Sequence, residues 1–287
     1  MRLLRPGNSD PPLPWRWQEW AQMVLPAELG RFLDFGCGDG ILLRTVARRC
    51  TECHGADVNP AAYAETAAAY PQFRFSQVGL DGRLDYPDGW FDTIAAVEVI
   101  EHVPDERAML AELTRVLRPG GRLLITTRHR GLLTWLDPGN LKFVLPGLHR
   151  FVHLRVLRDR EYYRRRFEEV QEHGLVGDIS QQDHRPPWHR HYKPAEILAF
   201  CPESLVLESV RVSFPGERAM QLMRVVLRVL CFGRLSPFPW PLPALDRWLS
   251  RWETRFGDNL VMMFVKRLDD GRPASEREAK TEAAGND

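Results

Sequence analysis

The sequence has no long apolar segment, few cysteines and almost no net charge. No run of 18 hydrophobic residues occurs, and Met1–Leu4 leads directly to Pro6 and Gly7 instead of an apolar signal core. Five cysteines are an odd number in a chain of 287 residues, which argues against a disulfide framework and for a reducing compartment. The net charge of +1 provides no overall basic field for nucleic acid. These absences predict a cytoplasmic protein that does not bind nucleic acid.

Strand and helix patterns alternate from residue 31 onward. Hydrophobic residues make up 44% of the chain, enough for one large domain with insertions or two small ones. Strands are expected at 31–35, 52–58, 73–78, 91–99, 122–127, 205–213 and 259–267, and helices at 41–49, 61–70, 105–117 and 194–200. The sequence Pro119–Gly121 is expected to stop the helix at 105–117. This alternation predicts an α/β fold, a doubly wound, mostly parallel, Rossmann-like sheet with helices on both faces.

Several segments depart from the alternation. Residues 1–30 are rich in proline and tryptophan and are expected to form an N-terminal arm, while the charged residues 269–287 are expected to be a disordered tail. Residues 31–268 then form one domain with two insertions. The first insertion, 128–190, is predicted to be a cap, and the second, 214–257, an apolar helical hairpin.

The most informative motif is the glycine-rich segment LDFGCGDG at residues 33–40. Three glycines at alternate positions let a strand turn tightly into a helix while the backbone approaches a ligand without obstruction by a Cβ atom. Asp57 ends the next strand, 17 residues after Gly40, where a carboxylate can accept hydrogen bonds from both hydroxyls of a ribose. The structural alternative for Asp57 is the N-cap of the following helix, although Asn59 suits that position. Together these features predict a nucleoside-binding site.

Two features favour a cationic nucleoside over a nicotinamide dinucleotide. Asp34 precedes the first glycine, where a carboxylate repels a diphosphate but attracts an ammonium or sulfonium group. The spacing GxGxG also differs from the GxGxxG pattern of dinucleotide sites. The downstream segments LDYPDGWFD (84–92), EVIEHVPD (98–105) and RVLRPGG (115–121) point the same way.

With these segments, the chain resembles the class I S-adenosylmethionine-dependent methyltransferases over residues 31–127, above all the small-molecule branch (type 11) that includes quinone-biosynthesis enzymes. The resemblance implies that S-adenosylmethionine is the cofactor. By the same resemblance, the methionine end lies on Asp34, Gly36, Cys37, Gly38 and Gly40, the ribose on Asp57, and the adenine on Val58. Glu98 belongs to the same set and, with Glu101 and His102, borders the methyl-transfer cleft.

One position departs from the family pattern. Members often have Gly-Asp after the third strand, with the acid facing the adenine amine, whereas this chain has Gly79-Leu80-Asp81. Either Asp81 reaches the amine through a shifted loop, or a backbone group serves instead.

Three histidines are candidates for the acceptor side of the site. His102 is either a general base that takes a proton from a substrate hydroxyl or a structural brace for the loop under the cofactor. His189 and His191 precede the helix at 194–200, and each either contacts the substrate or lies on the surface. The segment 50–54 matches the CxxCH pattern of covalent haem, but no second ligand pair for zinc accompanies it, so coincidence is the preferred interpretation and no metal is expected.

The two insertions suggest an amphiphilic acceptor. Residues 122–166 hold eleven Arg or Lys residues against three acids, which is either a solvated helix face or a cap that attracts an anionic group. The hairpin 214–257 is either a lid packed on the sheet or a surface for a membrane or partner.

The sequence thus predicts transfer of a methyl group from S-adenosylmethionine to a small-molecule or lipid-linked acceptor, most readily at oxygen, with peripheral membrane contact through the hairpin as an option. A non-catalytic nucleotide-binding module and an NAD(P)-dependent oxidoreductase are the alternatives.

Overall fold

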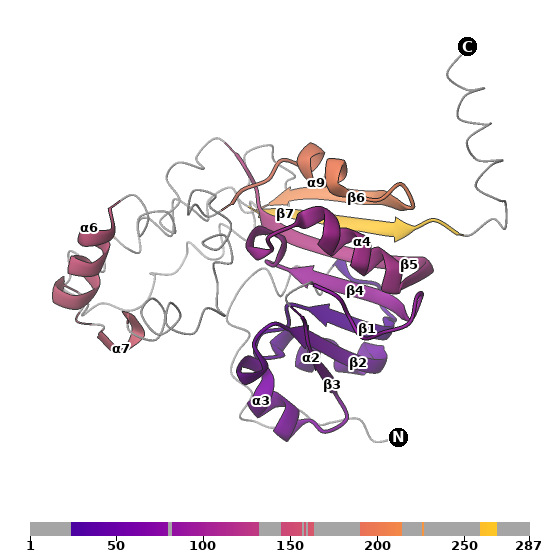
Figure 1. The fold of residues 1–287 in the computed structure, drawn as a ribbon, viewed down its shortest axis with the longest axis horizontal. Coiled ribbons are helices and arrows are strands. Elements are labelled where there is room, and N and C mark those ends of the chain that lie inside the picture. Colours follow the sequence, from indigo (N-terminus) through magenta and orange to yellow (C-terminus); the bar gives the residue numbers. More distant parts are fainter. Residues whose placement is uncertain are drawn as a thin grey trace, which may run out of the picture.

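A seven-stranded sheet in the order β3-β2-β1-β4-β5-β7-β6 forms the centre of the molecule (Figure 1). The computed structural model describes residues 24–79, 82–131, 145–156, 158, 160–163, 190–213, 226 and 259–268. The strands are β1 (Gly30–Phe35), β2 (Cys50–Asp57), β3 (Arg74–Gln77), β4 (Phe91–Val97), β5 (Leu117–Arg128), β6 (Leu205–Ser213) and β7 (Asn259–Lys266). The helices are α2 (Ile41–Val46), η1 (Ala47–Arg49), α3 (Pro60–Ala69), η2 (Ile100–His102), α4 (Glu106–Val116), α6 (Pro146–Phe151), η5 (Val152–Val156), α7 (Arg160–Tyr163) and α9 (Pro194–Phe200).

Six of the seven strands, β1 to β6, run in the same direction, and β7 runs in the opposite direction. β1 pairs in parallel with both β2 and β4, so the strand order reverses between these neighbours. β7 runs antiparallel between β5 and β6. The predicted doubly wound, mostly parallel α/β fold is therefore confirmed. In such sheets, ligands bind beyond the carboxyl ends of the strands where the order reverses.

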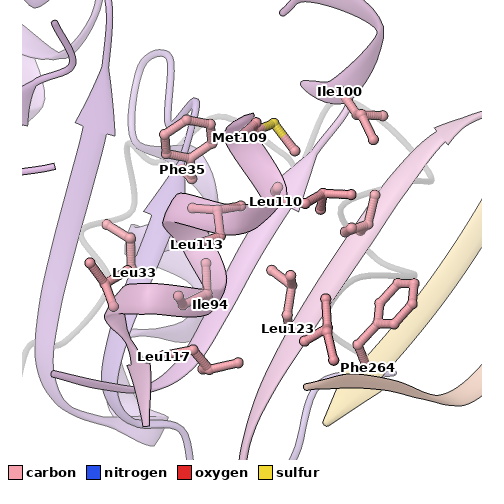
Figure 2. Close-up of a cluster of buried hydrophobic side chains, with 14 of the residues drawn as sticks. Leu33, Phe35, Ile94, Ile100, Met109, Leu110, Leu113, Leu117, Leu123 and Phe264 are labelled. Atoms are coloured by element: carbon pink, nitrogen blue, oxygen red, sulfur yellow. The ribbon is translucent and has the colours of Figure 1, made fainter. Parts of the chain in front are cut away.

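Alternating side chains of the strands divide the core into two faces. Leu33, Ile94 and Leu123 belong to one buried cluster, beneath α4 and α9. Figure 2 shows Met109, Leu110 and Leu113 of α4 reaching this face of the sheet. Phe32, Ala95 and Leu124, one position away along each strand, belong to the second cluster, which α2 covers. Burial on both faces explains the nearly continuous apolar run of β4.

The start of β5 differs from the expectation. The helix ends at Val116, and β5 begins at once with Leu117, so Pro119–Gly121 lies inside the strand rather than stopping the helix. Leu117 pairs with Phe91 and Arg122 with Thr93, so the residues between Leu117 and Arg122 form an irregularity in the ladder. Gly120 has a φ of 73°, which favours glycine at this bulge.

Part of the first insertion is helical. α6 and α7 stand apart from the sheet, on the side toward which the carboxyl ends of the parallel strands point (Figure 1). Nearly all of the predicted hairpin 214–257, the tail 269–287 and most of the arm 1–30 lie outside the described residues. Among the helices that are described, none is both long and apolar enough to cross a bilayer.

Candidate active site

The glycine-rich turn leaves β1 and enters α2 through three left-handed glycines. Gly36, Gly38 and Gly40 have φ values of 74°, 51° and 71°. A Cβ atom on Gly36 would lie 2.4 Å from Cγ2 of Val99, so a side chain has no room there. Among the described residues, other than its two chain neighbours, none has an atom within 4 Å of a Cβ atom on Gly38, so that position is open on this side. The turn therefore exposes backbone at the end of the sheet, as the sequence predicts.

Asp57 holds this turn from the next strand. Its Oδ2 accepts a hydrogen bond from the N–H of Gly38 at 2.9 Å, and its Oδ1 accepts one from the N–H of Asn59 at 2.9 Å. The N-cap of α3 is Asn59, whose Oδ1 accepts from the N–H of Ala61 at 3.1 Å, so the helix-cap alternative for Asp57 is wrong. A carboxylate oxygen has two acceptor sites, and among the described residues each oxygen of Asp57 accepts one hydrogen bond, which leaves one site for a ligand.

Asp34 is buried below the same turn. It is 2% exposed, and its Oδ2 is buried without a hydrogen-bond partner among the described residues. Burial, reinforced by the carboxylates of Asp57 and Asp39, raises the pKa of Asp34 to about 8. A buried carboxyl group that feels two other acids and has one oxygen without a partner among the described residues is a site that a cationic group would stabilise.

Cys37 is buried within the turn, and burial together with the charge of Asp34 raises the pKa of its thiol well above its usual range. It therefore stays a neutral thiol at physiological pH, which argues against nucleophilic catalysis.

Thr66 on α3 is a supporting residue that the sequence did not single out. Its Oγ1 donates to the carbonyl of Asp39 at 2.6 Å, and its Cγ2 would lie 3.0 Å from a Cβ atom on Gly40. The side chains of Tyr63 and Thr66, three residues apart, are the two buried positions of α3. In the sequence, this helical spacing was the signal available for a buried Thr66, but it could not show which loop the side chain contacts.

Glu98 lies just beyond β4 rather than inside the expected strand, because β4 ends at Val97. Its φ of 55° is unusual for a residue other than glycine and stores strain. Its N–H donates to the carbonyl of Thr126 at 3.0 Å, and its Oε1 accepts from Oγ1 of Thr126 at 3.2 Å. Nε of Arg128 lies 3.5 Å from Oε2 of Glu98. The neighbouring strand thus holds Glu98 at the carboxyl end of the sheet.

His102 ends the short helix η2, immediately after the buried Glu101. Oε2 of Glu101 accepts from Oγ1 of Thr127 at 2.8 Å, and the N–H of His102 donates to the carbonyl of Val99 at 2.8 Å. The His102 side chain is half-buried. Glu98, Glu101 and His102 therefore share one turn beside Gly36, whose missing side chain would meet Val99.

The chain returns from the first insertion at this same turn. The backbone of Tyr192 forms a parallel bridge with His129, and its side chain reaches the carbonyl of Ile100 and the carboxylate of Glu106. His191 is half-buried next to it. His189 and Asp81 lie outside the described residues, and Val58 packs against the edge of the core beside Asp57.

The CxxCH match at residues 50–54 lies in β2, where successive side chains point to opposite faces of the sheet. Cys53 lies in the cluster under α2, whereas His54 points to the opposite face, where its ring packs edge-on against Tyr86 and Phe91 at 5.4 and 5.2 Å. Burial lowers the pKa of His54. This histidine is a core residue of β2.

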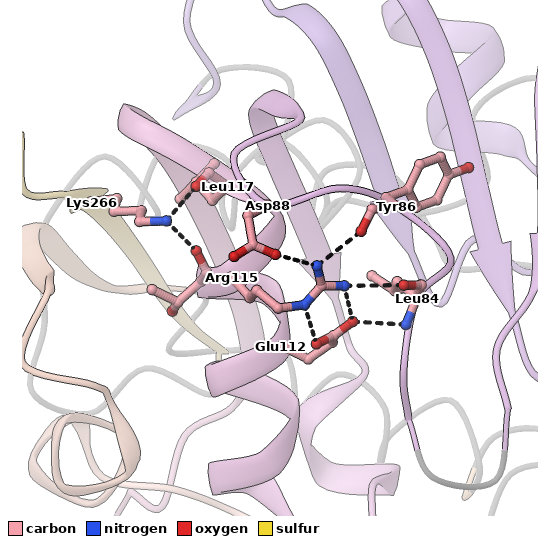
Figure 3. A network of polar contacts seen from close by, with 8 residues as sticks. Leu84, Tyr86, Asp88, Glu112, Arg115, Leu117 and Lys266 are labelled. Atoms are coloured by element: carbon pink, nitrogen blue, oxygen red, sulfur yellow. Dashed lines mark hydrogen bonds and ion pairs between the residues drawn. The ribbon is translucent and has the colours of Figure 1, made fainter.

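Two of the segments on which the family resemblance rests, 84–92 and 115–121, contribute to a structural network of hydrogen bonds. Arg115 binds both oxygens of Glu112 at 2.7 and 2.8 Å, the carboxylate of Asp88 at 2.6 Å and the carbonyls of Leu84 and Tyr86 (Figure 3). This network fastens the loop before β4 to the C-terminal half of α4.

The family model and the relatives that match this chain are all described as methyltransferases. Residues 33–125 match a family described as a methyltransferase domain. The chain is 30% identical over 128 residues to a ubiquinone biosynthesis O-methyltransferase of Alkalilimnicola ehrlichii, covering 43% of this chain and 51% of that protein. It is 26% identical over 159 residues to the protein of the same description from Idiomarina loihiensis, covering 51% and 65%. The chain thus spans about half to two thirds of these relatives.

A solved structure has a similar fold. The S-adenosylmethionine-dependent methyltransferase from Mesorhizobium loti superposes with a TM-score of 0.52 and 18% identity, covering 87% of this chain and 98% of that one. At this identity the likeness concerns the fold.

Proposed function

We propose that this chain, which its methyltransferase domain at residues 33–125 and the order of its strands identify as a class I S-adenosylmethionine-dependent methyltransferase, methylates an oxygen of a small-molecule acceptor. The observation that carries the cofactor in this proposal is the buried carboxyl group of Asp34, whose Oδ2 has no hydrogen-bond partner among the described residues, under a glycine turn that Asp57 holds in place. The oxygen acceptor is proposed from the relatives described as O-methyltransferases. The cofactor, S-adenosylmethionine, supplies an electrophilic methyl group on a sulfonium that is already a good leaving group.

The residues of the turn fit such a cofactor. Asp34 offers its carboxylate to the ammonium group, while Gly36, Cys37, Gly38 and Gly40 form the wall against which the methionine end lies. Asp57 offers one free acceptor site on each oxygen to the ribose hydroxyls, and Val58 packs on the adenine. Glu98 completes this set from the end of β4. Asp81 remains the candidate for the adenine amine.

The acceptor side has two candidate histidines. His102, half-buried in the turn after β4, takes the proton of the acceptor hydroxyl in one version of the mechanism and braces the turn in the other. His191 is the second candidate, on the segment that returns from the cap. The protein otherwise contributes alignment and proximity, which account for much of the rate in an in-line displacement.

We extend the proposal to an amphiphilic acceptor and a peripheral contact with the membrane. Leu145, Leu148 and Phe151 of the cap are 48%, 48% and 56% exposed, which is unusual for three neighbouring large apolar residues. Arginines follow at 150, 155, 158 and 160, and cations next to apolar side chains suit an anionic lipid surface. The hairpin 214–257 remains a second candidate for this contact.

Incubation with methyl-labelled S-adenosylmethionine and separate lipid and polar metabolite extracts tests the function. Label transferred to a product that base hydrolysis or mass spectrometry identifies as an ether or ester supports O-methylation. Tight cofactor binding by calorimetry without transfer to any fraction would instead support the non-catalytic module. A change in nicotinamide absorbance with NAD(P)H would support the oxidoreductase.

A further inference from the structure

A buried cluster joins the end of the cap to the turn that carries His102. Nη1 of Arg190 donates to Oε1 of Glu106 at 3.0 Å, and the hydroxyl of Tyr192 donates to the same oxygen at 3.0 Å. The side chains of Arg190 and Glu106 are only 15% and 11% exposed, and Tyr192 is 5% exposed. We call Glu106, Arg190 and Tyr192 the latch. Glu106, the first residue of α4, lies more than 80 residues before Arg190 and Tyr192, which stand at the end of the first insertion.

The latch holds the backbone on both sides of His102. Nη1 of Arg190 donates to the carbonyl of Val103 at 2.8 Å, and the hydroxyl of Tyr192 lies 3.3 Å from the carbonyl of Ile100. These two carbonyls flank Glu101 and His102. On the opposite side of the turn, Thr126 and Thr127 of β5 hold Glu98 and Glu101. The segment 98–103 is therefore fixed from β5 and from the returning chain together.

Tyr192 also connects the latch to β5 through the backbone. Its N–H donates to the carbonyl of Arg128 at 2.9 Å, and its carbonyl accepts from the N–H of Arg130 at 2.8 Å. The start and the end of the first insertion are thus joined at one point, next to the turn.

We propose that Arg190, Tyr192 and Glu106 are positioning residues, which set the place of His102 for methyl transfer. The inference rests on the proposed function. Its three residues lie outside the sequence segments on which the family resemblance rests, which are 33–40, 84–92, 98–105 and 115–121. Charged hydrogen bonds in a buried cluster have a defined geometry, so even the loss of one hydroxyl should displace the turn.

The test compares Tyr192→Phe and Glu106→Gln with a matched control, Glu112→Gln. Glu112 lies on the same helix and also pairs with an arginine, but its network ties down the loop before β4 (Figure 3). Three quantities are measured: the affinity for S-adenosylmethionine by calorimetry, kcat with the acceptor from the labelling experiment, and hydrogen exchange of the peptide 98–104.

Tyr192→Phe is expected to lower kcat about 3- to 10-fold, to leave the cofactor affinity within about 2-fold, and to speed exchange in 98–104. Glu112→Gln is expected to lower the melting temperature without changing kcat or that exchange. Unchanged exchange in both latch variants would overturn the latch. Faster exchange with unchanged kcat would overturn its role in positioning.

The exchange measurement needs no acceptor, so it tests the latch independently of the proposed function. Faster exchange in a protein that binds cofactor but transfers no label would leave the latch in place and reject the proposed function. Glu106→Asp, which keeps the charge, should recover part of the kcat that Glu106→Gln loses.

Discussion

The carboxylate of Asp57 accepts a hydrogen bond from the backbone N–H of Gly38, 19 residues earlier, at 2.9 Å. The residue that the resemblance assigns to the ribose therefore also fixes the turn assigned to the methionine end. One side chain links the two halves of the candidate cofactor site, and a change at Asp57 should affect both.

Asp57→Ala is expected to weaken binding of S-adenosylmethionine and of its demethylated product about ten- to several-hundred-fold, because hydrogen bonds to a charged group are worth about 1.5–3 kcal/mol each. Calorimetry measures both affinities. Asn59→Ala, which removes the cap of α3, is the control and should cost about 1 kcal/mol of stability with little change in affinity. Unchanged affinity in a folded Asp57→Ala protein would remove Asp57 from the site.

Two glycines of the same turn should respond differently to alanine. Gly36→Ala places a Cβ atom 2.4 Å from Val99. In Gly38→Ala the new Cβ atom has no neighbour within 4 Å in the described part of the chain, so only the left-handed φ opposes the change. Gly38→Ala should therefore cost about 1–2 kcal/mol, and Gly36→Ala clearly more. Urea unfolding of both variants without cofactor measures this. Equal costs would show that steric exclusion at Gly36 is unimportant.

Cofactor binding should release a proton near neutral pH. Asp34 has a pKa of about 8 in the protein, so most of it is protonated at pH 7, and a cation placed beside it would lower that pKa. Calorimetry in buffers of different ionisation enthalpy should detect close to one released proton at pH 7 and almost none at pH 9.5. Affinity should rise with pH through about 8. No proton release at pH 7 would argue against a cation at Asp34.

The same carboxyl should lower the stability of the free protein. Between about pH 3.9, the value for an unfolded chain, and pH 8, the folded state binds more protons at Asp34 than the unfolded state does. Stability therefore falls as pH rises through this window. Asp34→Asn should raise the melting temperature at pH 8 by several degrees while weakening cofactor binding, and the gain should vanish near pH 4. A variant that melts lower at pH 8 would contradict the assignment.

His102→Ala separates the two roles of that residue. A general base predicts a loss of about 10²–10⁴ in kcat with cofactor affinity close to that of the unchanged protein. A brace predicts that cofactor affinity and melting temperature fall together. Steady-state kinetics, calorimetry and thermal unfolding on one preparation distinguish these outcomes.

The exposed side chains of α6 predict binding to anionic vesicles. Leu148→Ser/Phe151→Ser should reduce co-sedimentation with phosphatidylglycerol vesicles at low salt and leave the melting temperature unchanged, because both residues are about half exposed. Phe238→Ser/Trp240→Ser is the parallel variant for the hairpin. If neither protein differs from the unchanged chain, or if the unchanged chain does not bind, the membrane contact is rejected and soluble acceptors remain.

Local patterns in the sequence correctly predicted much of the fold. The apolar strands, the glycine turn and the Asn59 cap depend on neighbours within a few residues, so periodicity and residue type were sufficient for them. The expected start of the fifth strand at residue 122 was wrong, because the pairing of Leu117 with Phe91 draws the chain into β5 before Pro119–Gly121 is reached. That pairing joins residues far apart in sequence and leaves no local signal.

In the candidate site, too, the features that depend on local sequence were predicted, and those that depend on long-range contacts were not. The sequence by itself determined that Asp34, three glycines and Asp57 stand at the ends of adjacent strands, because parallel strands bring their carboxyl ends to one edge of the sheet. Only the tertiary structure decided that Oδ2 of Asp34 is buried without a partner among the described residues, that Thr66 supports the turn, and that Glu106, Arg190 and Tyr192 meet beside His102. Burial and long-range contacts arise when the whole chain packs, and spacing along the sequence does not encode them.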